Sequence, residues 1–177
     1  TLEHPASMSA MKKWAKNTRR NHIIVEHNDD SGSVDEQAYI KKLTSDVRVV
    51  SIVHTSPVTG MTVDLEKITK EVRNVTPDCI IIVDGIQHSS HGAIDVQKYD
   101  IDGYVVSPYK MFSRHGYGVA WASDRLCTLN KEQLADGPFQ NWELGTRDAG
   151  SYATFSDVVD YLDWLGSNFT ESENTRE

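Results

Sequence analysis

Two short apolar runs in the middle of the chain each end in side chains that can take part in chemistry. The first run ends in Asp84, and Gln87 follows three residues later. The second run ends in Ser107, and Lys110 follows three residues later. Because ligands bind at the carboxyl ends of the strands in a parallel sheet, we expect these four side chains to lie together at one edge.

This set of side chains matches what an enzyme needs to hold pyridoxal 5'-phosphate. The amine of Lys110 can form a Schiff base with the aldehyde of the cofactor. The carboxylate of Asp84 can keep the pyridine nitrogen protonated, so that the ring accepts electrons. The sequence therefore predicts a cofactor site that joins the ends of two strands.

Composition and charge allow an enzyme and exclude a few other functions. The chain has 177 residues, 38% hydrophobic and 25% charged, which is typical of one globular domain with a core. The formal net charge of -8 argues against nucleic acid or an anionic membrane as the main partner. No apolar run approaches the length of a membrane span. The two cysteines do not suggest a disulfide framework, so we expect a reducing, cytoplasmic compartment.

The order of apolar patterns predicts an α/β protein in which strands and helices alternate. Strands are expected at residues 22–26, 47–53, 79–83, 102–106 and 118–122. Helices are expected at residues 8–20, 34–43, 64–75, 124–134 and 151–165. The second helix should begin with a capping box of Ser33 and Glu36, and the last should turn Phe155, Val158, Val159, Leu162 and Leu165 inward. This alternation favours a mostly parallel sheet between two helical layers, a three-layer αβα sandwich.

Five short motifs follow one another along the chain. They are Glu3-His4-Pro5-Ala6-Ser7, the loop of residues 54–60, Asp84-Gly85-Ile86-Gln87 with residues 91–96, Ser107-Pro108-Tyr109-Lys110, and Glu143-Leu144-Gly145-Thr146. In this order they resemble the class V aminotransferase family of fold-type I, pyridoxal-phosphate-dependent enzymes, in its cysteine-desulfurase-like branch. The resemblance implies the large, cofactor-binding domain of an aspartate-aminotransferase-like fold. It implies an incomplete domain at residues 1–166. Residues 167–177 are polar and acidic with almost no apolar content, which predicts a disordered tail or linker.

The resemblance assigns a role to each candidate side chain. Lys110 and His4 would be the catalytic residues, with Lys110 carrying the Schiff base and His4 stacking on the pyridine ring. Asp84 would pair with the pyridinium nitrogen. Gln87 would bond the phenolate oxygen or pack beside the ring, and Ser107 would donate to the phosphate.

Four further residues are candidates for contacts with a neighbouring subunit or with the substrate. Thr146 would reach the phosphate of a neighbouring subunit, so the resemblance implies a homodimer with shared active sites. Arg114 and Arg147 could bind a substrate carboxylate, because a guanidinium group matches it bidentately. His88 could contact the substrate, and with His91 it lacks a third ligand, so no metal site is expected.

Two substitutions and the length of the chain depart from the family pattern. Pro57 stands where the family usually carries Asn, and proline has neither a side-chain amide nor an N–H group. Tyr109 stands where the family more often carries His. The family also has an N-terminal phosphate-binding turn and a C-terminal small domain, which in desulfurases carries a nucleophilic Cys. Neither is found here, so we expect the central piece of a longer enzyme.

The predicted activity is that of a pyridoxal-phosphate-dependent transferase or lyase that acts on an amino acid. Cysteine desulfuration, transamination and epimerisation all remain open, because they share the residues seen here. A non-catalytic, truncated domain that serves as a binding module is the first rival. A Rossmann-like nucleotide-binding domain is the second, and the missing Gly-x-Gly-x-x-Gly pattern counts against it.

Overall fold

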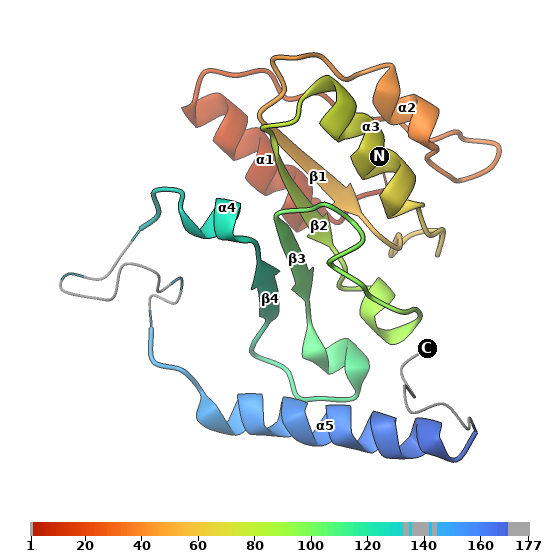
Figure 1. Ribbon diagram of the computed structural model, residues 1–177, viewed down its shortest axis with the longest axis vertical. Helices are drawn as coiled ribbons and strands as arrows, with labels where there is room; N and C mark the ends of the chain where they lie inside the picture. The colour runs from red at the N-terminus through yellow and green to blue at the C-terminus, as the bar shows by residue number, and fades with distance from the viewer. Residues whose placement is uncertain (1, 133–134, 136–141, 143–144, 170–177) are drawn as a thin grey trace.

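The computed structural model describes residues 2–132, 135, 142 and 145–169 of the chain. The described strands form one sheet in the order β1-β2-β3-β4, with bounds Val49–Val53, Ile80–Asp84, Gly103–Val106 and Val119–Ala122. The first three strands are parallel, and β4 is antiparallel to β3 (Figure 1). The predicted α/β fold with a mostly parallel sheet is therefore confirmed.

One face of the sheet carries the hydrophobic core. Alternate residues of β1 and β2 point to this face, and all are at most 8% exposed: Val50, Ile52, Ile81 and Val83. The helix α3 (Leu65–Val75) covers them with Leu65, Ile68 and Val72, which recur at the helical spacing and are buried. Asp64 begins this helix by accepting a hydrogen bond from the Lys67 N–H group at 3.1 Å.

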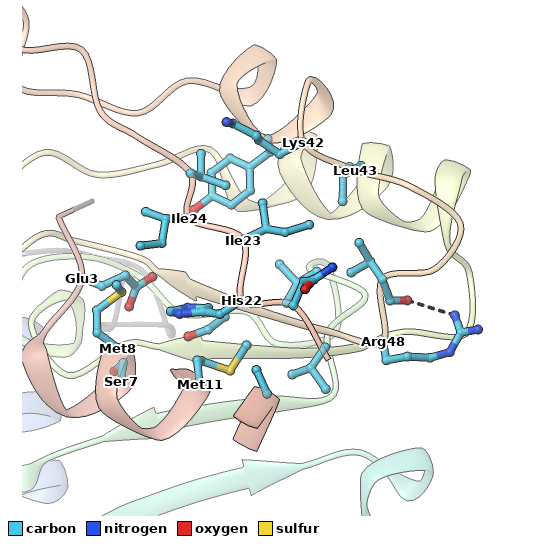
Figure 2. Close-up of a pocket in the computed structure, with 18 of the residues that line it drawn as sticks. Glu3, Ser7, Met8, Met11, His22, Ile23, Ile24, Lys42, Leu43 and Arg48 are labelled. Carbon is cyan, nitrogen blue, oxygen red and sulfur yellow. Dashed lines mark hydrogen bonds between the residues drawn. The ribbon is translucent and has the colours of Figure 1, made fainter. Parts of the chain in front are cut away.

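The other side of β1 borders a large cavity. Figure 2 shows side chains of the helix α1 (Pro5–Asn17), among them Met8 and Met11, facing His22 and Ile23 across this cavity. Val49, Ser51 and Val53 also line it, and its volume is about 620 Å³. Residues 22–26 were expected to form a strand, and this prediction is wrong. A strand needs a neighbouring backbone at about 4.8 Å. The cavity lies between this segment and β1, so no ladder forms among the described residues.

The helix α2 (Glu36–Ile40) is shorter than predicted and begins differently. Asp35 caps it by accepting a hydrogen bond from the Ala38 N–H group at 2.8 Å. The predicted capping box is therefore wrong, because the Ser33 hydroxyl bonds the Ser31 hydroxyl at 2.7 Å instead. A carboxylate caps a helix as well as a hydroxyl group does, and the sequence contains both Ser33 and Asp35 within three positions.

The remaining helices differ from prediction at their ends. Pro5 lets α1 begin earlier than expected, since proline suits the first turn of a helix. The helix α4 (Asp124–Cys127) spans four residues, whereas residues 124–134 were predicted, of which 133–134 lie outside the described residues. Two short 3-10 helices, η1 (His88–Ser90) and η2 (Pro108–Met111), follow β2 and β3.

The helix α5 (Ala149–Ser167) lies along the lower edge of the fold, away from the sheet (Figure 1). Its first turns contact the loop before β4, where the Thr154 and Ser113 hydroxyl oxygens are 3.3 Å apart. The predicted inward residues are not core residues: four are half-buried, and Leu165 is 36% exposed. Residues 170–177 of the predicted tail lie outside the described residues. No helix in the described part of the chain has the length and apolar character needed to cross a bilayer.

A buried carboxylate joins the amino ends of β2 and β3. The side chain of Asp102 is 2% exposed, accepts a hydrogen bond from the Ile81 N–H group at 2.9 Å, and pairs with Arg73 at 2.8 Å. Arg125 lies 3.4 Å from its other oxygen, to which the Ser123 hydroxyl donates at 3.1 Å. Because these contacts fix the start of β3 against β2, they also fix which residues meet at the carboxyl ends of the two strands.

Replacing this carboxylate should destabilise the fold. We expect Asp102→Asn to lower the free energy of unfolding by about 3–5 kcal/mol, because the Arg73 guanidinium, 11% exposed, loses its buried counter-charge. Urea denaturation measures this change. The matched control is Asp100→Asn, whose carboxylate is 66% exposed and 3.4 Å from the same arginine. The control should cost less than about 1 kcal/mol, and equal losses in the two variants would contradict the structural role of Asp102.

Candidate functional site

A cavity of about 220 Å³ lies at the carboxyl ends of β1, β2 and β3. Its lining consists of His4, Ala6, Ser7, Val53, Thr55, Pro57, Asp84, Ile86, Gln87, Ser107, Tyr109 and Lys110. Five of the six residues predicted to bind the cofactor belong to this lining, and Thr146 does not. The structure therefore brings together side chains from the start of α1 and from the ends of three strands.

The strand register places the acid and the hydroxyl at the same edge. Asp84 lies opposite Val105 in the parallel pair of β2 and β3, and Ser107 follows two residues later. The turn η2 then brings Lys110 back over the strand ends, with its backbone N–H bonded to the Ser107 carbonyl at 3.0 Å. Gly85 lets the chain after Asp84 pass close to the Tyr104 ring, because a Cβ atom there would overlap that ring.

An amide holds the lysine side chain in the cavity. The Lys110 Nζ donates a hydrogen bond to Gln87 Oε1 at 2.7 Å. Since an ammonium group only donates, this contact fixes which end of the Gln87 amide faces the lysine. The amide nitrogen then lies 3.3 Å from the Nε2 of His91 and can donate to it. The amine is thus positioned by a neutral partner rather than by a counter-charge.

Both oxygens of Asp84 accept hydrogen bonds from neutral donors. The Ser7 hydroxyl donates to Oδ2 at 3.1 Å, and the Ile86 N–H group donates to Oδ1 at 3.1 Å. Asp84 takes part in none of the ion pairs among the described residues. Sequence reasoning did not assign Ser7 a role of its own. Its place in the Glu3–Ser7 motif, which also contains His4, was the signal that could have found it.

His4 and Tyr109 supply aromatic side chains to the lining of the cavity. His4 precedes α1, and its Nδ1 accepts a hydrogen bond from the Ala6 N–H group at 3.2 Å, which orients the exposed ring. The Tyr109 ring stacks on His115, with ring centroids 4.3 Å apart. Each ring can offer a flat face to a planar ligand.

His88 lies beneath the site rather than in the lining of the cavity. It is 8% exposed and stacks on His54 with ring centroids 3.5 Å apart. Its Nε2 lies 3.2 Å from the Ala93 carbonyl, which can only accept, so this nitrogen carries the proton. Its Nδ1 then accepts a hydrogen bond from the Thr55 hydroxyl at 2.8 Å. The pair therefore joins the loops that follow β1 and β2.

Burial keeps these two histidines neutral. Burial, and to a lesser degree the nearby His88, lowers the pKa of His54 to about 3. Burial also lowers the pKa of His88. The neutral rings can stack without charge repulsion, and the His54 Nδ1 lies 2.8 Å from the Tyr104 hydroxyl. This pair is a structural connection between segments that are distant in sequence.

Three other predicted residues do not line the cavity. Arg114 lies 3.7 Å from Asp148, and both side chains are 56% exposed. Thr146 and Arg147 are exposed in the segment before α5. The first two residues of the Glu143–Thr146 motif lie outside the described residues. Within the described chain, these side chains are therefore separate from the lysine and the aspartate.

Glu3 is a second carboxyl group close to Asp84, and it lines the larger cavity (Figure 2). Burial and the negative charge of Asp84 raise the pKa of Glu3 to about 7, although a backbone hydrogen bond from Val53 lowers it. Both effects disfavour the ionised form of this side chain. Glu3 therefore changes its charge near neutral pH.

The polar groups of the smaller cavity match those of pyridoxal phosphate. It offers the Lys110 amine for an aldehyde, the Asp84 carboxylate for a ring nitrogen, the Ser107 hydroxyl for a phosphate oxygen and the Gln87 amide for a phenolate oxygen. No group of three His, Cys, Asp or Glu side chains in the described residues could hold a metal ion. The residues present fit this cofactor by chemical type.

Comparison with known protein sequences matches the chain to one family model and to proteins named as cysteine desulfurases. The family model for aminotransferase class-V matches residues 1–175. A probable cysteine desulfurase from Mycoplasma genitalium is 28% identical over 124 residues, which cover 70% of this chain and 30% of that protein. A cysteine desulfurase from Wigglesworthia glossinidia brevipalpis is 34% identical over 96 residues, which cover 54% and 23%. The matched part of this chain therefore covers less than a third of the length of each of these curated relatives.

Comparison with solved structures shows the same fold. The cysteine desulfurase CsdA from Escherichia coli matches with a TM-score of 0.78 and 24% identity, over 91% of this chain and 43% of that one. The apo structure of a cysteine desulfurase from Thermococcus onnurineus matches with a TM-score of 0.78 and 21% identity, over 94% and 44%. At these identities the likeness concerns the fold.

Glu3 and His54 affect stability in opposite directions as the pH changes. Glu3 binds its proton more tightly when folded, so its contribution is full below its ordinary value of 4.5 and is lost as the pH rises to about 7. His54 binds its proton less tightly when folded. Its contribution is present above its ordinary value of 6.5 and is lost as the pH falls toward about 3. The two contributions to the free energy of unfolding therefore largely offset each other between pH 4.5 and pH 6.5, where the two ranges overlap.

Removing the Glu3 carboxyl should expose the effect of the histidine. As the pH falls from about 7 to about 5, we expect the free energy of unfolding of Glu3→Gln to fall by about 2 kcal/mol more than that of the parent. Urea denaturation at the two pH values measures this difference. Glu26→Gln, at an exposed position, is the control and should behave like the parent. If Glu3→Gln also followed the parent, Glu3 would titrate at its ordinary value.

Proposed function

The chain belongs to the aminotransferase class-V family, and we propose that it is the cofactor-binding part of a pyridoxal-phosphate-dependent enzyme that acts on an amino acid. One observation carries this proposal: Lys110 Nζ lies 2.7 Å from Gln87 in a cavity that Asp84 also lines. When bound, the cofactor supplies an aldehyde that bonds amines and a ring that withdraws electrons from the α-carbon of an amino acid.

The residues of the chain would divide the work of binding and proton transfer. Lys110 would hold the aldehyde through its amine, and the same amine would move a proton at the α-carbon of the substrate. Asp84 would hold the ring nitrogen with its carboxylate. Ser107 would donate to the phosphate, Gln87 would bond the phenolate oxygen, and His4 would hold the ring by aromatic contact.

Cysteine is the substrate that the relatives favour, since both sequence relatives described above are named as cysteine desulfurases, one of them as probable. Desulfuration of cysteine also needs a group that accepts the sulfur. Cys79 is buried at the start of β2 and Cys127 ends α4, and neither lines the cavity. If this enzyme is a desulfurase, its sulfur acceptor is therefore neither of these thiols.

Pro57 favours a second candidate reaction at the same cavity. It lines the cavity at the position where the family motif carries Asn, and it can donate no hydrogen bond. Transamination or epimerisation of an amino acid would use the same lysine, aspartate and serine. The loss of the Asn contact at this position therefore favours one of these two reactions over cysteine desulfuration.

Assembly and compartment belong to the same proposal. Residues 1–166 form part of the large domain, and the enzyme is a homodimer with shared active sites, in which Thr146 reaches the phosphate bound by its neighbour. The exposure of Thr146 outside the cavity of its own chain supports this arrangement. Both cysteines are free thiols, which supports a cytoplasmic location. The net charge of -8 supports a small-molecule substrate over nucleic acid.

The lysine assignment can be tested by visible absorption. We expect the parent chain with added pyridoxal phosphate to develop a band that differs from that of the free cofactor, because Lys110 bonds the aldehyde. Lys110→Ala should lose this band. The control is Lys98→Ala, since Lys98 is 67% exposed and pairs with Asp95 at 3.4 Å. An unchanged band in Lys110→Ala would contradict the assignment, and no band in any form would remove the enzyme proposal for this chain.

A further inference from the structure

We propose that Ser7 is a positioning residue for Asp84. The Ser7 hydroxyl holds the Asp84 carboxylate so that one of its oxygens is directed at a protonated ring nitrogen in the cavity. This inference rests on the proposed function, because it needs a ligand whose ring carries an N–H group. Ser7 belongs to a different part of the chain from the carboxylate: the two residues are 77 positions apart in sequence.

The geometry of Asp84 is the first argument. Its Oδ2 accepts from the Ser7 hydroxyl at 3.1 Å, and its Oδ1 accepts from the Ile86 N–H group at 3.1 Å. Each carboxylate oxygen can accept about two hydrogen bonds, so each keeps a free acceptor site. The two donors therefore fix the plane of the carboxylate and leave it able to bind a third donor from the cavity.

The behaviour of the serine hydroxyl is the second argument. Ser7 lies in the first turn of α1, where no carbonyl of its own helix lies one turn earlier to accept from the hydroxyl. The hydroxyl donates to Asp84. Pro5 begins this helix and the His4 ring caps it, so the backbone just before Ser7 is held in place. The hydroxyl is therefore a fixed donor.

The charges around Asp84 are the third argument. No Lys, Arg or His side chain in the described residues forms an ion pair with this carboxylate. Among the described residues, the hydrogen-bond donors to this carboxylate are the Ser7 hydroxyl and the Ile86 N–H group, both of which are neutral. The orientation of Asp84 therefore depends on these two donors and not on a counter-charge.

The test compares two ligands that differ only at the ring nitrogen. One is pyridoxal phosphate, and the other is its analogue in which a C–H group replaces that nitrogen. Equilibrium dialysis gives the dissociation constant of each for the parent, Ser7→Ala and Ser7→Thr. We expect Ser7→Ala to weaken the binding of pyridoxal phosphate about tenfold, since a hydrogen bond to a charged group is lost. Binding of the analogue should change less than about twofold, because it makes no N–H contact with Asp84.

Two controls separate positioning from folding. Ser7→Thr keeps the hydroxyl and should bind both ligands as the parent does. Asp84→Asn should lose the preference for pyridoxal phosphate over the analogue. The far-ultraviolet circular dichroism of each variant shows whether α1 and the rest of the fold remain intact. If Ser7→Ala does not fold, Ser7→Thr still tests the role of the hydroxyl, and a loss of the preference in that folded variant overturns the inference.

The remaining outcomes distinguish this inference from the proposed function. Equal weakening of both ligands in Ser7→Ala would show that Ser7 shapes the cavity without acting through Asp84, and would overturn the inference alone. Unchanged binding of both ligands would overturn it as well. If the parent bound neither ligand, the proposed function would fail, and the role of Ser7 would fail with it.

Discussion

The parallel register between β2 and β3 is the constraint on which the site depends. At the amino ends of these strands, Asp102 joins Ile81 to Arg73 and so fixes the two backbones against each other. At the carboxyl ends the same register sets Asp84 opposite Val105, two residues before Ser107. A slip of one residue would turn every side chain of a strand to the other face of the sheet. The buried ion pair at one end of the strands therefore determines the chemistry at the other end.

The electrostatic character of the cavity follows from this arrangement. Asp84 is held by a hydroxyl and a backbone N–H group, and Lys110 is held by an amide oxygen. The histidines beneath the cavity are neutral, because burial lowers the pKa of both His54 and His88. Neutral partners orient the two ionisable groups without neutralising them, so their charges remain available to a ligand. A cofactor with a protonated ring nitrogen and a reactive aldehyde can use both.

The sequence predicted those parts of the fold and site that depend on local patterns. An apolar run followed at once by a polar residue marks the buried end of a strand, and this pattern alone predicted that Asp84, Ser107 and Lys110 lie at one edge of the sheet. Other features depend on contacts between distant segments, which a single sequence does not show. Residues 22–26 have strand-like composition, yet a cavity separates them from β1. His88 was expected to contact substrate, yet it stacks on His54, which is 34 positions earlier in sequence.

Covalent labelling tests the central claim most directly. The protein would be mixed with pyridoxal phosphate, reduced with borohydride and digested, and the labelled peptide located by mass spectrometry. The account predicts a pyridoxyl group on Lys110, because that amine alone among the lysines of the described residues lines the cavity of Asp84 and Ser107. Labelling spread over the exposed lysines, with none favoured on Lys110, would contradict the account.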